Sequence, residues 1–151
     1  MKVSDIMTRQ VETVGPDDTL QKAAAVMDRL NVGFVPVHDG SRVVGVITDR
    51  DIVVRALAAG SDPEPTKVGD VMTEEVHYCL EDDAIADIVE HMAALQVRRL
   101  PVFSRQGNRL LGIVSIGDIA VHASEHITAD LLRRISEPSS PDRPRPRAAG
   151  S

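Results

Sequence analysis

Two short segments of the chain carry side chains that could bind a nucleotide. Residues 45–51 read GVITDRD and residues 112–118 read GIVSIGD, so each has a glycine, two apolar residues, a hydroxyl and then an aspartate three positions further on. A carboxylate can accept hydrogen bonds from both hydroxyls of a ribose, and a hydroxyl beside the free N–H groups of a helix start can hold phosphate. The glycine lets the backbone approach a ligand closely. The pattern therefore indicates a ribose-phosphate ligand at Asp51 and at Asp118.

The same spacing also has a purely structural interpretation. Thr48 and Ser115 stand three residues before Asp51 and Asp118, and a hydroxyl followed by an acid at this distance is typical of a helix-capping box. Each segment is expected to lie where a strand ends and a helix begins. Both interpretations therefore stay open from the residues alone.

Both segments belong to an internal repeat. The pattern V-x-D-x-M-T occurs at residues 3–8 and again at 68–73, and Pro-Val occurs at residues 36–37 and again at 101–102. Such a repeat predicts two similar structural units, and two copies packed face to face would form a cleft between them. We predict a first domain at residues 1–60, a linker at 61–67, a second domain at 68–126, a helical extension at 127–135 and a disordered tail at 136–151.

Hydrophobic periodicity predicts the same order of elements in both copies. An aspartate-rich turn, at residues 15–18 and 82–83, supplies a helix N-cap, and apolar residues then recur at helical spacing. Two apolar strands follow, which indicates sheets covered on both faces. A second helix is expected at residues 51–59 and again from 118 to about 126. The first of these is apolar nearly all round, which favours burial on more than one side. The strands are predicted at residues 35–37, 43–47, 100–103 and 110–114.

The composition excludes several classes of protein. A formal net charge of −6 and a pI near 5.3 argue against nonspecific nucleic-acid binding, which needs a basic surface. No apolar run approaches the roughly 20 residues of a membrane span, and the N-terminus does not resemble a signal peptide. The single Cys79 excludes an internal disulfide and fits a reducing compartment. We expect an acidic, cytoplasmic protein with an aliphatic core.

The repeated motifs resemble those of a pair of CBS domains, the module named after cystathionine β-synthase. The resemblance rests on V-x-D-x-M-T, on the Pro-Val strands and on the segments that end in Asp51 and Asp118, and it covers residues 3 to about 125. It implies an α/β (α+β) fold of two β-α-β-β-α units related by a pseudo-twofold axis. In many members the cleft between the units holds an adenosine nucleotide. The chain is also similar to small stand-alone bacterial proteins of this family, including the hypoxic-response type.

The resemblance implies two composite ligand sites. In each, one unit supplies the segment that runs from the glycine to the aspartate, and the other supplies a strand and the residues around its Pro-Val pair. Site one would consist of Ile47, Thr48, Arg50, Asp51, Val76, His77, Tyr78, Arg98, Arg99 and Leu100. Site two would consist of Val11, Thr13, Gly33, Phe34, Val35, Val114, Ser115 and Asp118. The implied regulatory ligand is AMP, ADP, ATP or a related compound such as NAD or S-adenosylmethionine, and no catalytic cofactor is implied.

The two sites differ in positive charge. The second copy has Arg98-Arg99 where the first has Gly33-Phe34, and the first has Asp49-Arg50 where the second has Ile116-Gly117. All three arginines therefore fall in site one, and the paired donors of a guanidinium match two phosphate oxygens. We predict that site one binds a phosphate-bearing ligand more tightly, and that site two is weaker or takes a less charged adenosine compound. The alternative is that Arg98 and Arg99 are surface or interface charges.

The histidines and the cysteine give weaker signals. His122 and His126 are four residues apart on an expected helix, so they could share a metal ion. No third ligand is predictable nearby, and we expect no metal site, with this pair as the weak candidate. Cys79 is expected to fill a small apolar space in the core, without a redox role.

Two functions of different classes remain. The first is a regulatory, signal-transduction module that senses an adenosine nucleotide and passes its state to an unidentified downstream protein. The alternative is a stress-related structural or interaction dimer that binds no nucleotide and could bind a metal. An enzyme is disfavoured because no nucleophile–base pair or metal-ligand cluster is evident, and because Asp51 and Asp118 fall in separate sites. A homodimer is expected, since the resemblance implies discs of two pairs and the helix at residues 51–59 is too apolar for a monomer.

Overall fold

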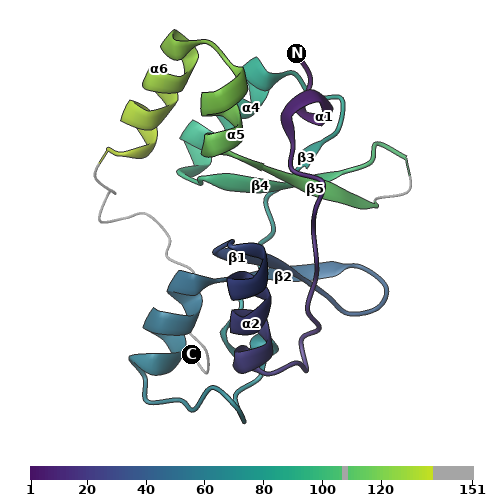
Figure 1. The fold of residues 1–151 in the computed structure, drawn as a ribbon, viewed down its shortest axis with the longest axis vertical. Helices are drawn as coiled ribbons and strands as arrows, with labels where there is room; N and C mark the ends of the chain where they lie inside the picture. Colours follow the sequence, from purple (N-terminus) through teal and green to yellow (C-terminus); the bar gives the residue numbers. More distant parts are fainter. Residues whose placement is uncertain (107–108, 138–151) are drawn as a thin grey trace. The chain divides into compact units, whose positions relative to one another are not determined.

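The chain folds into two compact units of mixed helices and strands (Figure 1). A computed structural model describes residues 1–106 and 109–137. We call residues 12–76 the first-repeat unit, and residues 1–11 together with residues 77–106 and 109–137 the second-repeat unit. Both units have helices packed beside a small sheet, which confirms the α/β (α+β) class. The predicted tail falls, from residue 138, outside the described residues.

The first-repeat unit is built around a hairpin. β1 (Phe34–His38) and β2 (Val43–Thr48) pair antiparallel, with Val35 opposite Ile47, and the register shifts between Val37 and His38. Val14 adds a parallel bridge to Val37 beside this hairpin. The helical elements of the unit are α2 (Leu20–Leu30), η1 (Asp51–Leu57) and α3 (Val68–Val71).

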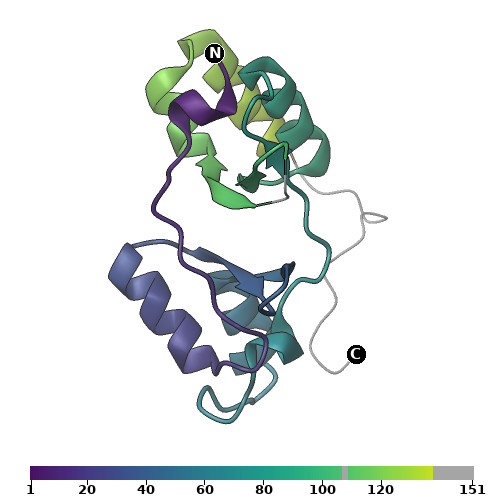
Figure 2. The ribbon, with the colours of Figure 1, turned by 90° about the vertical axis from the view of Figure 1, so that its right-hand side faces the viewer.

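The second-repeat unit has a three-stranded sheet in the order β3-β4-β5. β3 pairs parallel to β4, and β4 pairs antiparallel to β5 with Leu100 opposite Val114. Within this unit the helices lie on one face of the sheet (Figure 2). The elements are α1 (Val3–Ile6), β3 (Cys79–Leu80), α4 (Ile85–Leu95), β4 (Arg99–Phe103), β5 (Leu110–Ser115), α5 (Ile116–His122) and α6 (Glu125–Ile135).

The aspartates before the first helix of each repeat close a turn and do not cap the helix, contrary to the prediction. Asp18 Oδ2 accepts from Gly15 N–H at 2.7 Å, and Asp83 Oδ2 accepts from Leu80 N–H at 2.9 Å. The N-cap of α2 is Thr19, whose hydroxyl accepts a backbone N–H from within the helix. The helix therefore begins later than the aspartates suggest.

The second helix of each repeat also differs from its prediction. η1 is a π-helix, and the N–H of Ala58 donates to the carbonyl of Val53, five residues earlier, at 2.9 Å. α5 ends at His122, because Ala123 is extended and Ser124 caps a new helix, α6. A continuous helix from residue 118 to 126 is therefore wrong, whereas a helix does cover the predicted extension at residues 127–135.

Each unit has its own aliphatic core. Leu20, Ile47 and Val68 are among the fully buried side chains of the first-repeat unit, and Met92 and Leu131 are among those of the second-repeat unit. The apolar helix η1 is buried on one side only. Val53, Val54 and Leu57 are 56%, 47% and 52% exposed in the single chain.

The two V-x-D-x-M-T segments each fold into the unit of the other repeat. α1, from the first copy, lies in the second-repeat unit, where Thr8 and Ile113 exchange two backbone hydrogen bonds of 2.8 and 2.9 Å. α3, from the second copy, lies in the first-repeat unit, where Thr73 and Val46 exchange two bonds of the same lengths. The repeats of the sequence and the compact units of the structure are therefore divided at different residues.

Among the described helices, none is both long and apolar enough to cross a bilayer.

Candidate functional site

Asp51 lies in a buried polar cluster at the junction of β2 and η1. Its Oδ2 accepts from the N–H of Thr48 at 3.0 Å, and its own N–H donates to the Thr48 hydroxyl at 3.0 Å. The hydroxyl of Thr73 lies 3.3 Å from both carboxylate oxygens. Arg55 Nε lies 3.4 Å from Oδ1. The carboxylate is therefore fixed by groups from three parts of the first-repeat unit.

Asp118 has the equivalent place in the second-repeat unit, between β5 and α5. Its Oδ2 accepts from the N–H of Ser115 at 2.9 Å, and its N–H donates to the Ser115 hydroxyl at 3.2 Å. The hydroxyl of Thr8 donates to Oδ1 at 3.2 Å. Both aspartates therefore form the reciprocal bonds of a capping box, as the structural interpretation predicts, and each has an additional threonine partner.

The threonines of the M-T motif are site residues that the sequence reasoning missed. The sequence marks V-x-D-x-M-T as part of the repeat and of the family resemblance, but it gives the threonine no role at the site. Thr8 and Thr73 stand at the same position of that motif, and each donates to the aspartate of the unit into which its segment folds. The sequence does contain a signal for this role, because a threonine occupies the same position of the motif in both copies.

Gly45 and Gly112 make room for these same segments. A Cβ at Gly45 would lie 2.8 Å from the Thr73 carbonyl oxygen, and one at Gly112 would lie 2.5 Å from the Thr8 carbonyl oxygen. No real Cβ is tolerated so close to backbone atoms, so both positions need glycine. The sequence predicts a close approach of these glycines to a ligand, whereas in the structure a segment of the protein lies against each of them.

Arg55 distinguishes the first cluster from the second. It is 7% exposed, and its Nη1 donates to the carbonyl oxygens of Val71 and Met72 at 3.3 Å each. The residue four positions after Asp118 is His122, which is exposed. Asp51 is only 5% exposed, while Asp118 is half-buried. The two carboxylates therefore occupy equivalent places with different electrostatic surroundings.

Burial is the main influence on the protonation of Asp51. Loss of solvent raises the pKa of this carboxyl above its ordinary value, because the charged form is poorly solvated. The Thr48 N–H, the Arg55 charge and the hydroxyls of Thr48 and Thr73 act in the opposite direction and lower the pKa. Burial therefore favours the neutral form of the Asp51 carboxyl, and the hydrogen bonds and the Arg55 charge of the cluster favour its charged form.

The residues predicted for each site are distributed over both units. Of site one, Ile47, Thr48, Arg50, Asp51 and Val76 lie in the first-repeat unit, and His77, Tyr78, Arg98, Arg99 and Leu100 lie in the second-repeat unit. Of site two, Thr13, Gly33, Phe34 and Val35 lie in the first-repeat unit, and Val11, Val114, Ser115 and Asp118 lie in the second-repeat unit. The assembly of either composite site stays a prediction.

Within each unit, the sheet brings residues of both predicted sites side by side. Ile47 pairs with Val35 in the first-repeat unit, and Leu100 pairs with Val114 in the second. Each sheet therefore carries, on paired strands, residues that the sequence assigns to different sites.

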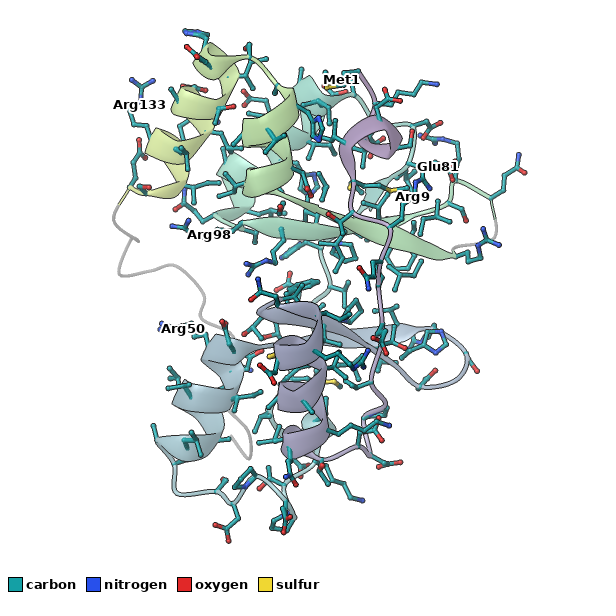
Figure 3. All side chains as sticks on the ribbon, in the orientation of Figure 1. Met1, Arg9, Arg50, Glu81, Arg98 and Arg133 are labelled. Carbon is teal, nitrogen blue, oxygen red and sulfur yellow. The ribbon has the colours of Figure 1, made fainter. Side chains whose placement is uncertain are left out.

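The three candidate phosphate-binding arginines differ in their exposure. Arg98 precedes β4 and Arg50 precedes η1, and both are exposed (Figure 3), while Arg99 is half-buried at the start of β4. No ion pair joins any of the three to a described acidic residue. The Asp49 carboxylate lies against Gly33, because a Cβ there would be 2.5 Å from Asp49 Oδ2. A phosphate at Gly33 would meet this negative charge.

The weak metal candidates are not neighbours on one helix face. His122 ends α5, whereas His126 lies in the first turn of α6, so their spacing of four residues does not align them. Within residues 1–106 and 109–137, no group of three or more His, Cys, Asp or Glu side chains could hold a metal ion. Cys79 is buried, and loss of solvent raises the pKa of its thiol to about 12.

The fold and the two equivalent carboxylate clusters define a duplicated α/β module. A family model for the CBS domain matches residues 3–57 and 68–125. The chain belongs to the CBS-domain family, and its pair of CBS domains is a regulatory module.

Comparisons with known proteins support this assignment along most of the chain. Hypoxic response protein 1 of Mycobacterium tuberculosis is 38% identical over 135 residues, which cover 89% of this chain and 93% of that protein. The CBS domain-containing protein YhcV of Bacillus subtilis is 41% identical over 127 residues, which cover 84% of this chain and 89% of that protein.

Solved structures show the same fold. A crystal structure of Hypoxic Response Protein I with two coordinated zinc ions has a TM-score of 0.72 at 38% identity, covering 82% of this chain and all of that one. The CBS domain pair of protein MJ0100, in complex with 5′-methylthioadenosine and S-adenosyl-L-methionine, has a TM-score of 0.71 at 26% identity, covering 80% and 94%.

Proposed function

We propose that this protein is a non-catalytic sensor of adenosine nucleotides that passes its ligand state to a partner protein. The ligand is AMP, ADP, ATP or a related adenosine compound. Membership in the CBS-domain family supports this proposal, and so does the pair of MJ0100, which was crystallised with two adenosine compounds. A location in the cytoplasm belongs to the same proposal and stays a prediction.

The observation that carries the proposal is the geometry at Asp51 and Asp118. Each carboxylate is held at a strand–helix junction by a backbone N–H and a threonine hydroxyl. A carboxylate fixed in this way loses little conformational freedom when it accepts the two hydroxyls of a ribose. The Thr8 and Thr73 hydroxyls donate hydrogen bonds to the carboxylates, as the hydroxyls of a ribose would. Ligand binding therefore replaces these hydrogen bonds or shares their acceptor oxygens.

The asymmetry of charge supports different ligands for the two sites. Arg50, Arg98 and Arg99 have no acidic partner among the described side chains and would meet the phosphates of a ligand in site one. The Asp49 carboxylate beside Gly33 would repel phosphate in site two. Site one is therefore proposed to bind AMP, ADP or ATP, and site two a less charged adenosine compound.

Titration calorimetry with AMP, ATP and S-adenosylmethionine tests the ligand assignment. Two hydrogen bonds to a charged carboxylate contribute at least about 1.5 kcal/mol each, so the loss of Asp51 costs about 2 to 4 kcal/mol of binding free energy. This corresponds to a loss of affinity on the order of 30- to 1000-fold. Asp51→Asn is the first variant, because it keeps an acceptor for the Thr48 N–H.

The matched control is Asp118→Asn, which makes the same change in the other unit. Asp51→Asn is expected to weaken the binding of the phosphate-bearing nucleotides AMP and ATP. Asp118→Asn is expected to leave the affinity for these nucleotides within a few-fold of the wild type. Equal affinity of AMP and ATP for the wild type and Asp51→Asn would refute the assignment of site one. No binding of any adenosine compound at millimolar concentration would favour the alternative, a structural or interaction dimer.

We propose in addition that the protein self-associates through η1. Val53, Val54 and Leu57 form an exposed apolar face on this helix, and such a face is costly in water. Sedimentation of the wild type and of Leu57→Glu compares the assemblies directly. A homodimer is expected for the wild type and a monomer for the variant. A wild-type monomer at micromolar concentration would contradict this part of the proposal.

A further inference from the structure

Arg55 is a buried charge whose contacts go beyond its aspartate. Its Nε faces Asp51 Oδ1 at 3.4 Å, and its Nη1 donates to two successive carbonyl oxygens, those of Val71 and Met72, at 3.3 Å each. One guanidinium therefore bonds both to the proposed ligand carboxylate and to the segment that ends in Thr73. Neither contact was foreseen from the sequence.

Thr73 closes this arrangement into a ring. Its hydroxyl returns to the Asp51 carboxylate at 3.3 Å, directly after the two residues that Arg55 holds. The Val71–Thr73 segment is thus joined to Asp51 by two independent polar links, one through Arg55 and one through Thr73. Its backbone is also paired with β2 through Val46.

One nitrogen of the Arg55 guanidinium takes no part in the ring. Arg55 Nη2 is buried and has no hydrogen-bond partner among the described residues. A buried donor without a partner is uncommon and costs free energy, so an arrangement that only stabilised the fold would be expected to satisfy it. π-helical geometry, which η1 has over Asp51–Leu57, is frequent at functional sites.

The second repeat lacks this link. His122 stands where the first repeat has Arg55, is exposed and ends α5. Among the described side chains, the Thr8 hydroxyl is the one polar link between Asp118 and the Met7–Thr8 segment. The two repeats differ in how firmly the carboxylate is connected to the segment exchanged from the other copy.

We propose that Arg55 is a positioning residue that fixes the Asp51 carboxylate and couples it to the Val71–Thr73 segment, so that a ligand on Asp51 changes the order of that segment. The ligand part rests on the proposed function, whereas the coupling is a property of the ligand-free protein. In the first-repeat unit, ligand binding is therefore transmitted as a change in the local stability of the Val71–Thr73 segment. The second-repeat unit, which has His122 at the position equivalent to Arg55, transmits less.

Hydrogen exchange and carboxyl NMR on the full chain test the coupling without any ligand. Arg55→Met removes the charge and both carbonyl links. The amides of Met72 and Thr73 are expected to exchange about tenfold faster, from the loss of roughly 1.4 kcal/mol of local stability. The pKa of Asp51 is expected to rise further, because burial persists without the opposing charge. His122→Met, the matched change in the second repeat, is expected to alter neither quantity.

Arg55→Lys separates the two roles and serves if Arg55→Met does not fold. A lysine keeps a positive charge beside Asp51 but lacks the fork that reaches two carbonyls. The pKa of Asp51 is expected to stay near that of the wild type, while Met72 and Thr73 exchange faster. Unchanged exchange in both variants would overturn the coupling, and an unchanged Asp51 pKa in Arg55→Met would overturn the positioning role.

The ligand arm uses AMP as the probe. In the wild type, AMP is expected to slow exchange at Met72 and Thr73 by more than at Thr8, and Arg55→Met is expected to lose affinity for AMP on the order of tenfold. Equal protection of both segments would overturn the asymmetry. If the wild type binds no AMP, the proposed function fails, while the ligand-free exchange and pKa measurements still decide the role of Arg55.

Discussion

The buried pair of Asp51 and Arg55 predicts a specific failure of additivity in stability. The two residues are 5% and 7% exposed, and their side chains approach to 3.4 Å. At an effective dielectric constant of about 20, this separation corresponds to a Coulomb attraction of about 5 kcal/mol, most of which offsets the cost of removing both charges from water. Removal of one partner leaves the other charge buried and alone, at a cost of about 3 to 5 kcal/mol.

Urea unfolding followed by circular dichroism gives the free energies of the double-mutant cycle. Asp51→Ala and Arg55→Met are each expected to lose about 3 to 5 kcal/mol. The double variant is expected to lose less than the sum by about 2 kcal/mol or more, because neither charge is then left unpaired. Asp118→Ala, which removes a capping partner and no ion pair, is expected to lose only about 1 kcal/mol.

Two results would refute this reasoning. Additive losses in the cycle would mean that the two charges do not interact in the folded protein. A loss for Asp118→Ala as large as that for Asp51→Ala would mean that the aspartates matter as helix caps, and that the buried arginine contributes nothing.

Three further predictions concern the units, the thiol and the pH. A fragment of residues 12–76 is expected to show cooperative unfolding by circular dichroism, and one of residues 1–60 is not, because the shorter fragment lacks the α3 side chains of its core. With a thiol pKa of about 12, Cys79 is expected to react with a disulfide reagent at pH 8 only after denaturant is added, and a fast reaction in the native protein would contradict its burial. Because burial raises the pKa of Asp51, this carboxyl is expected to take up its proton at a higher pH than an ordinary aspartate, so the AMP affinity measured by calorimetry is expected to weaken earlier as the pH is lowered. The proton held by Asp51 in the folded state adds stability that is present below the unfolded pKa and lost as the pH rises through the folded pKa.

The repeat predicted most of the secondary structure, because periodicity and turn residues act locally. Strands appear where the Pro-Val pairs predicted them, and the hydroxyl–aspartate spacing gave the capping geometry at Asp51 and Asp118. The helix expected across residues 118–126 failed because Ser124 offers a second N-cap, and its hydroxyl accepts the N–H of Ile127. A competing cap within a helical pattern is easily overlooked.

The exchange of segments could not be predicted from the sequence. Residues 3–8 and 68–73 carry the same pattern, so either could pack against either sheet, and only the path of the chain decides. Arg55 was missed for a different reason. An arginine on a helix is mostly exposed, and the corresponding His122 gave no matching signal. Its burial depends on the carbonyl oxygens of Val71 and Met72, which lie in a segment that the sequence assigns to the other repeat.

The exchange has a consequence for how the two copies diverge. Thr8 belongs by sequence to the first copy but serves Asp118 in the second, and Thr73 belongs to the second copy but serves Asp51 in the first. A substitution in the V-x-D-x-M-T segment of one copy therefore acts first on the aspartate of the other copy. Neither copy can drift toward a new specificity, or be deleted, without altering the other. Each half of the duplication therefore limits the substitutions that the other half can accept.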